Sequence, residues 1–148
     1  MRTAEFEAAE ALLRRGARLD LPAAAALGRV EDARRLLPGT GSDDRHRALA
    51  LSAQFGRTEI VRMLLDTGEG PSRYNPVGCH AHSTPLHQSA LAGNEATVCL
   101  LVERGARLDL KDTVWQGTPE GWALHGGKTQ VADYLRSQME QGAKPKKH

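Results

Sequence analysis

The sequence has few aromatic residues and few cysteines. Phe, Trp and Tyr each occur twice in 148 residues, and the two cysteines are Cys79 and Cys99. Two thiols are too few for the disulfide framework of a small secreted protein. The first ten residues are acidic and lack the apolar stretch of a signal peptide. No apolar run approaches the ~20 residues that a membrane span needs, so we expect a cytoplasmic protein without membrane contact.

An excess of charge of one sign is also lacking. The chain has 20 Lys and Arg residues against 18 Asp and Glu residues, and the two signs are interleaved. Proteins that bind nucleic acid or an anionic membrane surface usually carry a field of positive charge. The balance therefore predicts no nucleic-acid partner and no membrane partner. Residues 143–148 are basic and contain a proline, which is typical of a disordered tail.

The sequence does contain an internal repeat. The heptapeptide RGARLDL occurs at residues 15–21 and again at residues 104–110. Glycines at positions 28, 56, 93 and 127 recur at intervals of 28, 37 and 34 residues. Each of these glycines is followed by apolar residues at helical spacing, which predicts a core stripe on a second helix. The matching positions are Ala33, Leu36, Leu37, Ile60, Val61, Leu64, Leu65, Val98, Leu100, Leu101, Val131, Tyr134 and Leu135.

Residues 83–112 are the most complete copy and read STPLHQSALAGNEATVCLLVERGARLDLKD. This stretch resembles an ankyrin repeat, TPLHxAAxxGxxxxVxxLLxxGAxxxxxD. The resemblance implies that Thr84 and Pro85 start a first helix, that Gly93 breaks it, and that Gly105 ends the second helix in a left-handed turn. It also implies that His87 hydrogen-bonds to Thr84. The expected fold is an all-α solenoid of stacked helix-turn-helix pairs with loop or hairpin fingers.

The alignment makes residues 1–142 a single ankyrin domain. It contains a half repeat at 1–18 and repeats at about 19–45, 46–74, 75–112 and 113–141. The helix of the half repeat has an apolar face and no preceding helix to cover it, so self-association through this helix is the alternative to a monomer. The composition, rich in Ala, Arg, Gly and Leu, suggests a bacterial protein.

The resemblance implies protein binding through a concave surface formed by the fingers and the outward positions of the first helices. It does not identify the partner, because a fold alone does not determine which ligand the protein binds. Trp and Tyr are the residue types that anchor interfaces, so Trp115 and Tyr74 are the strongest candidates. The full set of predicted partner-binding residues is Tyr74, His80, His82, Trp115, Gln116, Phe55, Leu91 and His125.

Cys79, His80 and His82 suggest a competing function. One thiolate and two imidazoles could serve as zinc ligands, so the alternative is a metal-binding protein or a metal-dependent enzyme. However, successive residues of an extended loop face opposite sides, and no second CxxC or HxxxH element is present. A nucleophile with its base and an orienting third residue is also missing. We therefore predict a non-enzymatic protein with no catalytic residue, no cofactor and no metal.

Overall fold

The computed structural model describes residue 7 and residues 19–143 of the chain. The predicted half repeat at 1–18, its proposed self-association and residues 144–148 of the predicted tail therefore lie outside the described residues, apart from residue 7. Within the described residues every regular element is a helix. The predicted all-α solenoid of stacked helix pairs is confirmed. No described helix combines the length and apolarity required to cross a membrane.

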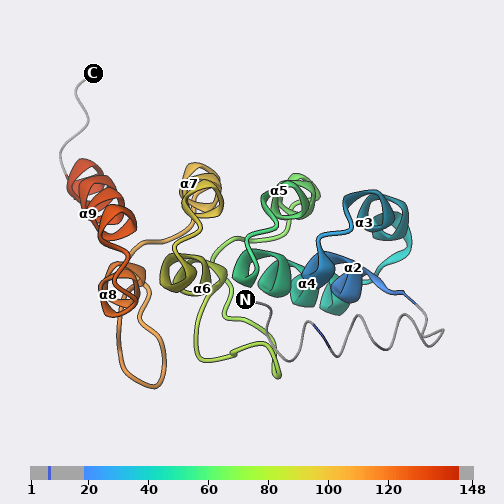
Figure 1. Ribbon diagram of the computed structural model, residues 1–148, viewed down its shortest axis with the longest axis horizontal. Coiled ribbons are helices and arrows are strands. Elements are labelled where there is room, and N and C mark those ends of the chain that lie inside the picture. The colour runs from blue at the N-terminus through green and yellow to red at the C-terminus, as the bar shows by residue number, and fades with distance from the viewer. Residues whose placement is uncertain (1–6, 8–18, 144–148) are drawn as a thin grey trace.

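The helices form four pairs that are stacked side by side in two rows (Figure 1). The first helices of the pairs are α2 (Leu21–Leu27), α4 (Ser42–Gln54), α6 (Pro85–Ala92) and α8 (Pro119–His125). The second helices are α3 (Val30–Leu36), α5 (Thr58–Asp66), α7 (Glu95–Glu103) and α9 (Thr129–Ala143), and a 3-10 turn, η1 (Leu37–Gly39), follows α3. Each first helix packs against the next first helix and against its own second helix.

The ends of α6 show why this sequence forms short helices. Thr84 caps the N-terminus: its hydroxyl accepts from the backbone N–H of His87, and the His87 side chain in turn accepts from the backbone N–H of Thr84. Pro85 occupies the first turn, where its missing N–H has no intrahelical partner to lose. Gly93 ends the helix with φ of +74°, a left-handed conformation that favours glycine. The predicted bond between His87 and Thr84 is thus present.

Gly93 also lies close to the next helix pair. A Cβ atom on Gly93 would lie 2.8 Å from Cδ of Lys128, the residue that follows the corresponding glycine of the next pair. Asn94 lies over Gly56 in the same way, at 2.8 Å from the Cβ position. The repeat of the glycines in the sequence therefore reflects both backbone conformation and the close approach of successive pairs.

The core runs through both rows of helices. The first helices bury alanines that are 0% exposed, at positions 24, 25, 48, 53, 90 and 123, and small side chains allow these helices to approach closely. The hydroxyl of Ser89 in α6 donates to the backbone carbonyl of Ala53 in α4 at 3.0 Å. Of the predicted apolar stripe, all positions are buried except Leu36, Leu37 and Tyr134, which are half-buried.

The connections between pairs differ in length, and this decides where fingers form. α4 begins at Ser42, four residues before position 46, where the sequence suggested the start of a repeat. Asp43 and Asp44 in its first turn interact favourably with the helix dipole. Two residues therefore separate η1 from α4, whereas long loops join α5 to α6 and α7 to α8. Both long loops extend on the side of the first helices (Figure 1).

Candidate functional site

The loop at residues 106–117, called here the second finger, is held by one buried carboxylate. Asp112 is 0% exposed. Four donors surround its two oxygens: the backbone N–H groups of Val114, Trp115 and Gly117 and the indole Nε1 of Trp122, at 2.9, 2.5, 2.7 and 2.8 Å. Although burial opposes ionisation, these hydrogen bonds hold the pKa of Asp112 well below its usual range. The carboxylate is therefore charged at neutral pH and orders both the finger and the Trp122 ring.

The aromatic side chains near this finger form a cluster. The Trp115 ring contacts the rings of His82 and Trp122 edge to face, with centroids 5.5 and 6.1 Å apart. His82 comes from residues 69–83, called here the first finger, and also lies 5.7 Å from Trp122. His87 of α6 packs against Trp122 at 5.0 Å. The cluster thus joins the two fingers to each other and to α6 and α8.

His87 connects α6 to the second finger through its other ring nitrogen. Its Nδ1 accepts from the backbone N–H of Thr84, so Nε2 carries the proton and donates to the carbonyl of Gly117 at 2.9 Å. Burial lowers the pKa of His87, which keeps the ring neutral in this arrangement. The base of the finger is consequently fixed to the preceding helix pair.

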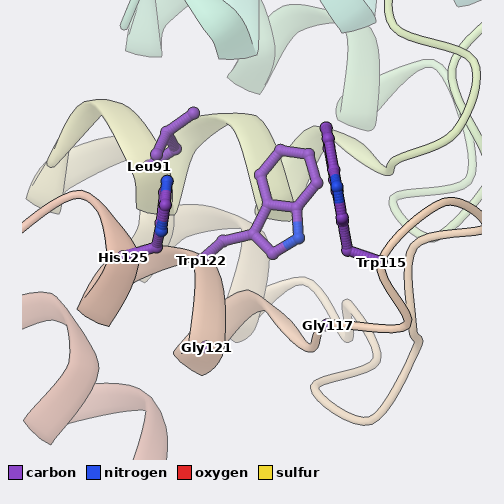
Figure 2. A pocket seen from close by; sticks show the side chains of 6 residues that line it. All are labelled: Leu91, Trp115, Gly117, Gly121, Trp122 and His125. Carbon is purple, nitrogen blue, oxygen red and sulfur yellow. The ribbon is translucent and has the colours of Figure 1, made fainter.

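A cavity of about 530 Å³ opens beside this cluster on the side of the first helices. α6 contributes one lining residue, α8 contributes three, and the second finger contributes two. The lining residues are Leu91, Trp115, Gly117, Gly121, Trp122 and His125. Figure 2 shows the His125 and Trp115 rings edge-on at either side of the Trp122 ring, with Leu91 close to His125. The cavity is therefore a slot with ring faces at its sides and an indole between them.

Three glycines shape the slot. A Cβ atom on Gly117 would lie 3.0 Å from Cδ1 of Trp122, so the indole occupies the space that a side chain would take. A Cβ atom on Gly126 would lie 2.8 Å from the backbone oxygen of Leu91, which shows how closely α8 approaches α6. Gly121 stands two residues after Pro119, at the position that His87 has in α6. The missing side chain at Gly121 leaves the edge of the slot open.

A family model described as ankyrin repeats, in three copies, matches residues 21–112. The chain belongs to the ankyrin-repeat family. The match covers α2 to α7 and ends at Asp112, the residue that orders the second finger. α8 and α9 form a further ankyrin-like helix pair beyond the matched segment, and α8 supplies three of the residues that line the slot.

Several curated proteins are similar to this ankyrin-repeat chain. Cyclin-dependent kinase inhibitor 2A of Homo sapiens is 33% identical over 122 residues, which are 79% of this chain and 75% of that protein. Cyclin-dependent kinase 4 inhibitor B of Homo sapiens is 33% identical over 123 residues, 79% of this chain and 85% of that protein. The inactive serine/threonine-protein kinase TEX14 of Bos taurus is 36% identical over 81 residues, 55% of this chain but 5% of that much longer protein.

The ankyrin alignment placed Leu91, Trp115 and His125 on a common surface, and the structure brings these three residues to one cavity. His82 packs on Trp115, and the rings of His80 and His82 lie 6.0 Å apart. These predicted residues are therefore neighbours, although they come from two fingers and two helices.

The other three predicted residues lie apart from the slot. Tyr74 is 38% exposed, and its hydroxyl donates to the carbonyl of Lys111 at 2.6 Å, so it connects the two fingers. Phe55 follows the last residue of α4 and is half-buried. Gln116 is exposed at the tip of the second finger, with φ of +59°. The structure therefore gives Tyr74 an evident structural contact that the sequence did not indicate.

Sequence reasoning missed two residues of this ankyrin surface. Trp122 was not among the predicted binding residues; it is 9% exposed, yet its ring lies between those of Trp115 and His125. Asp112 was not singled out at all. A signal was present, because Asp at the start of a short loop often accepts hydrogen bonds from backbone N–H groups two or three residues later.

The residues of the metal alternative are spread over the first finger. Cys79 is 5% exposed, and its Sγ lies 3.4 Å from Nη1 of Arg47, which also donates to the carbonyl of Val77. His80 has φ of +62° and is exposed, whereas His82 packs against the tryptophans. Within residues 19–143, no group of three or more His, Cys, Asp or Glu residues is placed to hold a metal ion. The geometry gives the metal alternative no support.

The row of second helices carries a smaller cavity of about 150 Å³. It lies between α7 and α9 and is lined by residues that include Glu95, Cys99 and Tyr134. Burial, together with the neighbouring Cys99, raises the pKa of Tyr134 to about 12, so the phenol stays neutral at physiological pH. This cavity has neither the size nor the exposed aromatic rings of the slot.

Proposed function

We propose that this ankyrin-repeat chain is a non-enzymatic module that binds a protein partner on the side of its fingers and first helices. The single observation that carries the proposal is the position of Trp115. Its indole is 71% exposed, although the backbone of its finger is held by the hydrogen bonds of Asp112. A large aromatic ring that stays in solvent on an ordered loop contributes little to folding, and tryptophan is the residue type most enriched at the energetic centres of interfaces.

Further apolar side chains on the fingers support a binding surface. Val114 in the second finger is 59% exposed, and Val77 in the first finger is 84% exposed. Val114 directly precedes Trp115, so the second finger presents two adjacent exposed apolar side chains. Exposed apolar groups that lie together are typical of interaction sites.

The absence of catalytic machinery at the slot favours binding over chemistry. His125 is the only ionisable side chain among the six lining residues. A general base acts on a nucleophile or substrate with the help of a second group that orients it, and no such group accompanies His125 in the lining. The slot therefore suits recognition of a side chain from a partner.

The first partner to test is a cyclin-dependent kinase. Two of the relatives are, by their names, inhibitors of such kinases, and this chain aligns with at least three quarters of each of them. A kinase of this class is therefore the first candidate partner. Any protein that binds on the finger side would agree with the proposed function.

The experiment compares two variants by biolayer interferometry against purified cyclin-dependent kinase 4. Trp115→Ala is expected to weaken binding about thirtyfold or more, because central tryptophans at interfaces contribute roughly 2 kcal/mol or more. The matched control is Met139→Ala, which removes a 37% exposed apolar side chain from α9. If the kinase does not bind, a photoreactive residue at position 115 is used to capture the partner from a cell extract. Equal partner binding by both variants would contradict a site on the second finger.

A further inference from the structure

The slot beside Trp122 has ring faces on its sides and no positive charge in its lining. The His125 and Trp115 rings stand on either side of Trp122 (Figure 2). None of the six lining residues is Lys or Arg. The face of an aromatic ring carries negative partial charge and attracts a cation that lies over it. A cation that enters the slot would therefore meet ring faces on more than one side.

A buried negative charge lies at the edge of the Trp122 ring. Oδ2 of Asp112 accepts from Nε1 of Trp122 at 2.8 Å and lies 3.1 Å from the Cβ position of Gly117, a lining residue. The carboxylate is shielded from solvent, so its field is weakly screened. A hydrogen bond from the indole to an anion also enriches the electron density of the ring, which strengthens its attraction for a cation. Both effects favour a positively charged ligand over a neutral one.

The shape of the slot distinguishes between kinds of cation. Its side walls are two upright rings with an indole between them, and its edge is open at Gly121. A guanidinium group is planar, stacks on aromatic faces and is more weakly hydrated than an ammonium group. It can therefore stack on a ring face that lines the slot, and it gives up less hydration than a lysine would.

We propose that the slot binds the guanidinium group of an arginine that the protein partner presents. This inference rests on the proposed protein-binding function, because it assigns the chemistry of the partner at the same site. Arginine is also among the residues that most often anchor protein interfaces. The guanidinium stacks on one indole face and meets the other indole, inclined at 65°, with its edge, while Asp112 at the edge of Trp122 supplies the opposite charge.

The test uses the two tryptophans as reporters. Because the chain has only two Trp residues, the ¹⁵N-labelled protein gives two indole N–H signals in its NMR spectrum, and both come from the slot. The full chain is titrated with Nα-acetylarginine amide and, at equal ionic strength, with the amides of Nα-acetylcitrulline and Nα-acetyllysine. Citrulline has nearly the same shape as arginine but no charge, and lysine has the charge without the flat group.

The arginine compound is expected to shift both indole signals to saturation. Its dissociation constant should be about threefold to fivefold lower than that of the citrulline compound, the range of a partly exposed cation–π contact. Trp115→Ala should weaken arginine binding by a similar factor, Trp115→Phe should retain most of it, and Met139→Ala should leave it unchanged.

Several outcomes would overturn the assignment. Equal binding of the citrulline compound would show that charge is not recognised, and equal or tighter binding of the lysine compound would exclude selection of a flat cation. The absence of a saturable shift at the solubility limit of the arginine compound would also overturn it. The titration contains no partner protein, so it tests the arginine assignment separately from the proposed function. If the arginine compound does not bind but a protein partner still binds in a way that depends on Trp115, the proposed function holds and the arginine assignment is wrong.

Discussion

The two fingers of this protein close at the base through equivalent backbone hydrogen bonds, but their loops are held in different ways. Asn75 lies seven residues after Gly68, and Asp112 lies seven residues after Gly105. The backbone N–H of Asn75 donates to the carbonyl of Ser83 at 2.8 Å, and that of Asp112 donates to the carbonyl of Gly117 at 2.9 Å. Equivalent residues therefore close the two loops.

Their side chains behave in opposite ways. The Asp112 carboxylate accepts four hydrogen bonds from the finger and from Trp122. The Asn75 side chain is 3% exposed, and neither its amide nitrogen nor its oxygen has a hydrogen-bond partner among the described residues. Seven residues separate Asn75 from Ser83, whereas four separate Asp112 from Gly117. The shorter loop brings its N–H groups around the side chain at its base.

The longer first finger is anchored from outside. Arg47 of α4 donates to the carbonyl of Val77 at 3.0 Å and lies 3.4 Å from the Cys79 sulfur. The second finger is organised by one of its own residues and is also tied to α6 by His87, whereas the first finger is tied to α4 by Arg47. The exposed Trp115 that we propose for binding lies on the second finger.

The largest effect should come from Asp112→Ala. The substitution leaves three backbone N–H groups and the Trp122 indole without their acceptor, and we expect the free energy of unfolding to fall by about 3 kcal/mol. Urea denaturation followed by Trp fluorescence measures the change. A loss smaller than about 1 kcal/mol, near the net value of a single hydrogen bond, would mean that the second finger does not depend on its carboxylate.

The same carboxylate predicts a dependence on acid. Because the pKa of Asp112 is lower in the folded protein than in the unfolded chain, its contribution to stability is fully present above the unfolded value of about 3.9. It decreases as the pH falls below that value toward the folded pKa. The difference in unfolding free energy between the wild type and Asp112→Asn should therefore shrink as the pH is lowered from 7 to about 3, which is below the unfolded pKa. A difference that stays constant over this range would argue against an ionised Asp112.

A smaller and more local effect is expected from Arg47→Met. The variant keeps much of the apolar stem but removes the bonds to the first finger, which should lower stability by about 1 kcal/mol. It should also increase the reactivity of the buried Cys79 toward a thiol reagent. The rate is measured in a Cys99→Ser background, so that only one thiol reacts. An unchanged rate would show that the first finger does not need Arg47.

The smallest effect should come from Asn75→Ala. Neither side-chain atom has a hydrogen-bond partner among the described residues, so the substitution should change the free energy of unfolding by less than about 0.5 kcal/mol. Asp112→Ala, measured in the same urea series, is the matched comparison. A loss of more than about 1 kcal/mol would show that the Asn75 amide is paired in solution, since a single hydrogen bond contributes about that much.

Much of the fold could be predicted from local patterns. The turn at Gly93, the cap formed by Thr84 and His87, and most of the apolar stripe are present as expected. These features depend on residues close in the sequence, or on a period that repeats along it. The site was predicted less completely. Leu91, Trp115 and His125 do line one slot, but Tyr74 contacts Lys111 and Trp122 supplies the wall between the rings.

Local patterns suffice to place the helices of each pair, because helical period, capping and glycine turns are local properties, and the ankyrin resemblance implied their stacking and the side of the fingers. The contact of Asp112 with the Trp122 indole, the packing of His82 on Trp115 and the slot between α6, α8 and the second finger arise from tertiary packing. The hydrogen bond of Arg47 to the first finger, that of Trp122 to Asp112 and the contact of the His82 and Trp115 rings all join residues ten or more positions apart in the chain. Such contacts form only when successive pairs have packed at their final distance, which is why no local pattern predicts them.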